Sequence, residues 1–242
     1  EAQAFGQTVA LDGWSRNGSV YFQLSAPLDP ASLPSAETTM SEPKAAVQLV
    51  DVTPGGAHYG ERRPLLFEQV DGKDDPFYLG PTLAVRPVFG FPLADRGTYC
   101  AFVTRALKGA DGKYLAANPA FDTALSTEPS LGPLRAWLED APVLASDLAS
   151  ATCFTTQDAT REMRILEAFI AGRPSTAPEE LVYTGKTQNF YEVVGWYHTP
   201  NFQSGDKPYR DEGGDLKLDE AGQPIVQEDE RVRFRLLIPR NS

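Results

Sequence analysis

Few residues of this chain have the types and spacing that catalysis requires. The sequence contains two histidines, His58 and His198. A serine nucleophile on a strand-to-helix elbow needs the pattern G-x-S-x-G, which exposes the hydroxyl beside an oxyanion hole, and this pattern does not occur. His198 could serve as a general base, but no serine or cysteine motif accompanies it. The sequence therefore predicts no catalytic residue, and a structural or surface role for both histidines.

Acidic residues form two clusters that could hold a cation. The clusters are Asp71, Asp74 and Asp75, and Asp211, Glu212, Asp215, Asp219 and Glu220. Calcium takes about six to eight oxygen ligands from closely spaced carboxylates and carbonyls, but neither cluster fits the EF-hand pattern. No zinc, P-loop or dinucleotide motif occurs either. We expect solvated acidic loops and no cofactor, with calcium as the alternative.

Aromatic residues gather between positions 190 and 209. The candidate binding surface among them consists of Trp196, Tyr197, His198 and Phe202. Together these side chains could line a groove for a carbohydrate or an apolar ligand. Because successive side chains of a strand point to opposite faces, inward packing of one face is the simpler interpretation.

The two cysteines, Cys100 and Cys153, each lie in a strand-like run. If the two strands are neighbours, a disulfide between them is geometrically possible. Two buried free thiols are the alternative. A disulfide would favour an exported protein, and the spacing matches no metal motif.

Size and charge limit the class of protein. With 242 residues, 41% hydrophobic and 10% aromatic, the chain can bury a core. Its net charge of −11 makes nucleic acid and anionic membranes poor partners. No apolar run is long enough for a membrane span. The N-terminus lacks the features of a signal peptide, so we expect either a cytosolic protein or an exported one whose leader was removed before residue 1.

Short apolar runs between turn residues predict an antiparallel β-sandwich over the first 157 residues. The predicted strands are Thr8–Leu11, Ser19–Ser25, Ala46–Val52, Pro64–Val70, Thr82–Val88, Thr98–Thr104 and Ala151–Thr156. An insertion near 116–148 lies between the last two of these strands. It is predicted to contain a loop from Pro119 to Pro133 and a helix at Leu134–Glu139. Asp95-Arg96-Gly97-Thr98-Tyr99 opens the sixth strand, where the Tyr99 hydroxyl can return to upstream backbone and lock a corner.

The pattern changes after residue 157. Thr156-Gln157-Asp158 can cap a helix over Ala159–Ile170, so a helix is expected within 158–173. A smaller α+β extension, 174–242, begins with a linker at Pro174–Pro178. Its predicted strands are Glu192–Thr199 and Arg231–Pro239.

The first part of the chain resembles the bacterial immunoglobulin-like modules of large secreted or surface proteins. The residues that carry this resemblance are Phe22-x-Leu24-Ser25-x-Pro27-Leu28-Asp29, Leu83-x-Val85-x-Pro87, Gly97-Thr98-Tyr99 and Phe154-Thr155-Thr156. One feature departs from antibody domains, since Cys100 directly follows Tyr99 and faces the other side of its strand. The disulfide between sheets that antibody domains contain is therefore not implied.

The second part resembles the lead-in of exported bacterial α/β-hydrolases of the lipase and esterase kind, which carry such a module at their N-terminus. The residues are Gly195-Trp196-Tyr197-x-Thr199-Pro200-Asn201-Phe202-Gln203 and Val232-x-Phe234-x-Leu236-x-Ile238-Pro239. The resemblance implies a non-catalytic N-terminal part of an exported serine hydrolase. Its partner would be a catalytic α/β-hydrolase domain in the same or a separate chain. The alternative is a stand-alone surface module that binds a glycan or a protein.

Overall fold

The chain divides into two compact units. The computed structural model describes residues 12–72, 80–209 and 213–240. Unit 1 comprises Glu1–Ala159 and unit 2 comprises Thr160–Ser242. In the described part, both units are built mainly from β-strands in small antiparallel sheets, which confirms the prediction of a mainly β chain. The helix and the extension that we predicted as separate segments belong to one unit.

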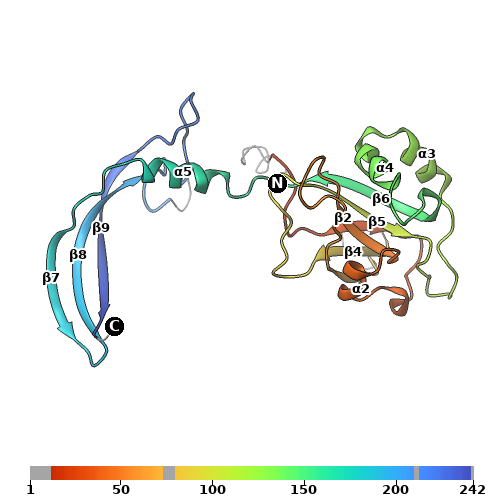
Figure 1. Ribbon diagram of the computed structural model, residues 1–242, viewed down its shortest axis with the longest axis horizontal. Coiled ribbons are helices and arrows are strands. Elements are labelled where there is room, and N and C mark those ends of the chain that lie inside the picture. Colours follow the sequence, from red (N-terminus) through yellow and green to blue (C-terminus); the bar gives the residue numbers. More distant parts are fainter. Residues whose placement is uncertain (1–11, 73–79, 210–212, 241–242) are drawn as a thin grey trace. The chain divides into compact units, whose positions relative to one another are not determined.

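Unit 1 contains two three-stranded sheets (Figure 1). The first has the strand order β1-β4-β3, with β1 at Val20–Gln23, β4 at Thr82–Pro87 and β3 at Leu65–Val70. The second has the order β2-β5-β6, with β2 at Val47–Asp51, β5 at Thr98–Thr104 and β6 at Leu148–Thr155. Every neighbouring pair of strands is antiparallel. The chain thus crosses from one sheet to the other after β1, β2 and β4.

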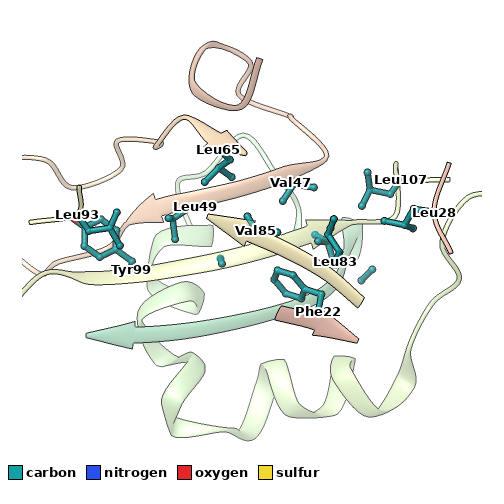
Figure 2. Packing of buried hydrophobic residues seen from close by; sticks show 13 residues of the cluster. Phe22, Leu28, Val47, Leu49, Leu65, Leu83, Val85, Leu93, Tyr99 and Leu107 are labelled. Carbon is teal, nitrogen blue, oxygen red and sulfur yellow. The ribbon is translucent and has the colours of Figure 1, made fainter. Parts of the chain in front are cut away.

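The two sheets share one hydrophobic cluster (Figure 2). Phe22 of β1 and Leu83 of β4 come from the first sheet, and Val47 of β2 and Tyr99 of β5 come from the second. All four side chains are almost completely buried. Alternation along β5 places Tyr99, Ala101 and Val103 in this cluster, while the residues between them face the other way.

Helices cover the other face of the second sheet. Helices α3 (Pro119–Thr127) and α4 (Gly132–Leu138) contribute Leu125 and Trp137 to a second cluster, which also contains Phe102 of β5. The rings of Phe102 and Trp137 lie 5.7 Å apart. The predicted helix in this insertion is confirmed, but the predicted loop from Pro119 is wrong because α3 begins there. Its first turn is capped by the Asn118 side chain, which accepts a hydrogen bond from the Phe121 N–H at 3.3 Å.

Unit 2 consists of a helix, a three-stranded sheet and the loop between its last two strands. Helix α5 spans Arg161–Ala171, and the sheet has the order β7-β8-β9. These strands are β7 at Glu179–Lys186, β8 at Phe190–Asn201 and β9 at Glu228–Pro239. β8 and β9 have more residues than any strand of unit 1, and β7 is as long as β6. All three strands of unit 2 curve along their length (Figure 1).

Several sequence predictions need adjustment. The predicted strand Thr8–Leu11 lies outside the described residues, whereas the other six strands of unit 1 and both predicted strands of unit 2 are present. We did not predict β7 or the short helix α2 (Ala36–Ser41). The cap predicted at Thr156 is wrong, since Thr160 precedes the first turn of α5. The described residues also include three 3₁₀ turns, at Pro30–Ser32, Pro129–Leu131 and Ala145–Asp147. No helix in the described part is long and apolar enough to cross a membrane.

Candidate functional site

One face of the sheet in unit 2 is apolar and largely exposed. The strand register brings together side chains from all three strands, which we call the tyrosine–leucine face. Its members are Leu181, Tyr183, Tyr191, Val193, Tyr197, Val232, Phe234, Leu236 and Ile238. None of these side chains carries a charge at neutral pH. Six of them remain more than a third exposed, which is unusual for a set of neighbouring large apolar residues.

Aromatic contacts order this face along the sheet. The rings of Tyr183 and Tyr191 lie 6.5 Å apart, and those of Tyr197 and Phe234 lie 6.0 Å apart. Beside the second ring pair, Gly195 of β8 has no side chain, so Phe234 and Leu181 can lie directly over its backbone. A Cβ at position 195 would come within 2.8 Å of Leu181 Cδ2 and 2.9 Å of the Phe234 ring. The face is therefore continuous across the central strand.

The opposite face of the same sheet is charged. Arg231, Arg233 and Arg235 alternate along β9 on this side. A guanidinium nitrogen of Arg231 lies 2.8 Å from Glu180 Oε1, and one of Arg235 lies 3.2 Å from Glu192 Oε1. The Arg231 guanidinium also stacks over the Trp196 ring, 4.6 Å from its centre. The two faces thus differ: the ion pairs lie on the charged face, which also holds the exposed Val182 and Leu237, whereas the side chains of the tyrosine–leucine face are uncharged.

The four residues of the candidate binding surface do not form one surface. Trp196 and His198 lie on the charged face, while Tyr197 lies on the tyrosine–leucine face. Phe202 follows the end of β8 and is buried against Phe169 of α5, with ring centres 5.6 Å apart. The prediction that these side chains could line one groove is therefore wrong, because the strand alternation separates them.

The polar surroundings of His198 do not assemble a catalytic set. Its Nδ1 lies 2.9 Å from Asp229 Oδ2, and its Nε2 lies 3.8 Å from Glu179 Oε2. Among the described residues, the polar contacts of His198 are thus carboxylates only. His58, the other histidine, lies 3.0 Å from Glu61 in an exposed turn. Within the part of the chain that the structure describes, no hydroxyl or thiol is hydrogen-bonded to either ring, where it could be activated.

The end of the sheet next to α5 is fixed by polar contacts. The Asn201 side-chain amide donates to the Tyr209 hydroxyl at 3.0 Å, and its oxygen accepts from the Gln203 N–H at 2.9 Å. Lys207 Nζ lies 2.7 Å from a Glu228 oxygen and 3.1 Å from a Glu230 oxygen. Hydrogen bonds to these two carboxylates raise the pKa of Lys207 above its usual value. These contacts hold the long loop against the strands.

One residue of the second acidic cluster, Asp219, organises a turn. Asp219 Oδ1 accepts hydrogen bonds from the N–H groups of Ala221 and Gln223, at 2.9 and 2.8 Å. Asp74, Asp75, Asp211 and Glu212 lie outside the described residues. Within residues 12–72, 80–209 and 213–240, no three acidic, histidine or cysteine side chains group as metal ligands. The expectation of no cofactor, with calcium as its alternative, stays a prediction.

In unit 1, Tyr99 closes the corner between β4 and β5. Its hydroxyl accepts a hydrogen bond from the Ala94 N–H at 3.0 Å, as the sequence predicted. Gly97 is required beside it, because a Cβ at that position would lie 2.6 Å from the tyrosine ring. Burial raises the pKa of the Tyr99 hydroxyl, while the hydrogen bond from Ala94 opposes this.

Cys100 and Cys153 form a disulfide across β5 and β6, where they are direct register partners with Cα atoms 4.1 Å apart. Cys100 is fully buried in the second cluster, beneath α3 and α4. The bond therefore joins two neighbouring strands of one sheet, on the face opposite Tyr99. It links the edge strand β6 covalently to β5, the central strand of the sheet.

A hollow lies between the edge strands β1 and β6. Trp14, Val20 and Phe154 line it together with the hydroxyl side chains of Ser19 and Thr152, and its volume is about 330 Å³. The Trp14 backbone is held on both sides, since its N–H donates to Thr155 at 2.8 Å and its carbonyl accepts from Gln157 at 2.9 Å. The indole nevertheless remains 70% exposed. An exposed aromatic ring on a fixed backbone thus lies beside an uncharged depression.

Comparison of the chain with protein-family models, with curated proteins and with solved structures finds no match. The geometry of the two units must therefore carry the functional argument. Sequence reasoning missed Leu181 and Tyr183 of the tyrosine–leucine face because it did not predict β7. The signal was the short run Leu181-Val182-Tyr183, which Thr184 and Gly185 follow.

Proposed function

We propose that this chain is the non-catalytic N-terminal part of an exported serine hydrolase of the lipase or esterase kind. In this proposal unit 1 is an immunoglobulin-like module. The strand orders β1-β4-β3 and β2-β5-β6 support it, because they match the B-E-D and C-F-G sheets of immunoglobulin constant domains. Tyr99 supports it further, since it opens β5, the counterpart of strand F, where such domains place their corner tyrosine.

The observation that carries the functional proposal is the uncovered tyrosine–leucine face of unit 2. An isolated three-stranded sheet gains little stability unless another layer covers its apolar face. In the described part of unit 2, only α5 is available as a second layer, and its Phe169 packs on Phe202 beyond the end of β8. Such a sheet is best explained as the first strands of a larger sheet that a catalytic domain completes.

The residues of this chain indicate which parts of the hydrolase it would supply and which the catalytic domain would supply. Its sequence lacks the G-x-S-x-G elbow, and its histidines contact carboxylates. The nucleophile, its base and the oxyanion hole would therefore come from the catalytic domain, in the same chain or another. Unit 1 would stabilise or position that domain, and the disulfide at Cys100 supports folding in an oxidising compartment outside the cytoplasm.

Ester hydrolysis tests this proposal. The native protein that contains this chain, here called the native material, would be isolated from the cells that make it. Its rate of p-nitrophenyl butyrate hydrolysis would be compared with that of the purified 242-residue chain. We expect hydrolysis by the native material only. Hydrolysis by the isolated chain, abolished by His198→Ala, would overturn the proposal, and so would native material without esterase activity.

A second function is favoured by one observation in unit 1, the exposed Trp14 beside its hollow. An aromatic ring can pack on the C–H face of a sugar while nearby hydroxyls bind its hydroxyl groups. A stand-alone glycan-binding module would use this site. Titration with neutral oligosaccharides such as cellohexaose should then change tryptophan fluorescence, and Trp14→Ala but not Trp196→Ala should abolish the change. The absence of any change in the unaltered chain would dismiss this second function.

A further inference from the structure

The two edges of the sheet in unit 2 differ in regularity. Strand β9 follows β8 in unbroken register from Phe190↔Pro239 to Asn201↔Glu228. The β7–β8 register shifts twice, around Glu179–Val182 and Tyr183–Gly185, and Glu180 has a φ of 47°. Bulges twist an edge and interrupt its row of backbone donors and acceptors. Among the described residues β9 pairs with β8 only, so β9 presents the regular open edge.

Charge determines which kind of strand fits this edge. Arg231 and Arg235 have carboxylate partners on the charged face. Arg233 lies between them and has no ion-pair partner among the described residues. An incoming strand would place a side chain directly opposite Arg233 on that face. A carboxylate there would be stabilising, whereas a cation would be repelled.

The same arginines disfavour a second copy of this chain as the occupant. Residues that lie opposite each other in an antiparallel pair point to the same face. Two β9 strands paired around a two-fold axis would therefore gather Arg231, Arg233 and Arg235 of both copies on one face. Like charges at opposite positions destabilise a pair, so a different polypeptide suits this edge.

We propose that the outer edge of β9 accepts a strand from the catalytic domain, with a carboxylate opposite Arg233 and apolar side chains that extend the tyrosine–leucine face. This inference rests on the proposed function for the source of the strand. It goes further by selecting β9 over β7 and by stating the chemistry of the partner strand.

Two synthetic peptides test the edge directly. Both have nine residues and alternate valine with a charged residue, which is glutamate in one and lysine in the other. With the glutamate peptide we expect amide hydrogen exchange in β9 to slow by about tenfold, because its backbone groups become paired. Exchange in β7 should not change, and the lysine peptide should have no effect.

Charge reversal supplies the matched control. Arg233→Glu should exchange the preference, so that β9 is protected by the lysine peptide and no longer by the glutamate peptide. Arg240→Glu, which places the same charge change just beyond the end of β9, should keep the original preference. Equal protection of β7, equal effects of the two peptides or an unchanged preference in Arg233→Glu would each overturn the inference.

These outcomes separate the two proposals. Protection of β9 without esterase activity in native material would retain the strand-accepting edge and reject the hydrolase. Esterase activity in native material, with no peptide effect on β9, would retain the hydrolase and reject this edge as the contact.

Discussion

The hydroxyl of Tyr99 and the backbone N–H of Ala94 form a hydrogen bond of 3.0 Å that closes the corner before β5. The same corner is tied to β6 through Thr156, whose hydroxyl accepts from the Gly97 N–H at 2.9 Å and donates to the Ala94 carbonyl at 2.6 Å. Ala94, the start of β5 at Tyr99 and Thr156 after β6 are thus joined by hydrogen bonds at one corner. The stability of unit 1 should depend on this point.

Tyr99→Phe should destabilise unit 1 while leaving its core packing in place. The phenylalanine ring fills the same buried space, but the Ala94 N–H loses its partner. We expect a loss of about 1–2 kcal/mol in the free energy of unfolding. Urea denaturation followed by the fluorescence of Trp137, which lies in unit 1, measures it. Tyr114→Phe, at an exposed position, is the control and should change nothing.

Alkaline pH should weaken unit 1 through the same residue. Burial raises the pKa of Tyr99 above its usual value of 10.0, so the unfolded chain releases this proton at a lower pH than the folded chain. The contribution is fully present below pH 10.0 and is lost as the pH rises through the folded pKa. Denaturation at pH 8 and at higher values should show this fall. In Tyr99→Phe the fall should be smaller, and an identical pH dependence would contradict the assignment.

Much of unit 1 follows from sequence because its strands are short apolar runs bounded by turn residues. The predicted strand Thr98–Thr104 coincides with β5, since β-branched and aromatic residues there face two different clusters. Helix α3 could not be predicted in the same way. Its Phe121 and Leu125 are its buried residues, and its position depends on the outer face of a sheet that the local sequence does not reveal.

Long-range contacts explain the other differences. Thr156 has the residue type of a helix cap, but its hydroxyl is used by the corner at Gly97, so the helix begins later at Arg161. Strand β7 has a short apolar run with bulges on both sides, and pairing with β8 defines it. The separation of Tyr197 from Trp196 and His198 did follow from strand alternation, which the sequence supplied. The uncovered face could be recognised only once all three strands were in place.

Removal of the disulfide should destabilise unit 1 and leave unit 2 unchanged. The bond closes a loop between residues 53 apart in sequence, which corresponds to about 4 kcal/mol in the chain-entropy estimate. Thermal unfolding with and without a reducing agent measures the loss. Unit 2 contains no cysteine, so the transition reported by Trp196 should not move. A shift of that transition would show that the two units unfold together.

The tyrosine–leucine face should be recognisable by an apolar dye, and two adjacent leucines provide a matched pair. Leu236 belongs to this face and is 49% exposed, while Leu237 points to the charged face and is 50% exposed. Both changes to lysine remove the same side chain at nearly equal exposure. Leu236→Lys interrupts a continuous apolar surface, so it should lower the fluorescence of bound Nile red. Leu237→Lys should have a much smaller effect, because its neighbours on that face include Glu192 and Arg235. Equal effects of the two variants would mean that the dye does not distinguish the faces, and the case for a covering layer on this side of the sheet would fail.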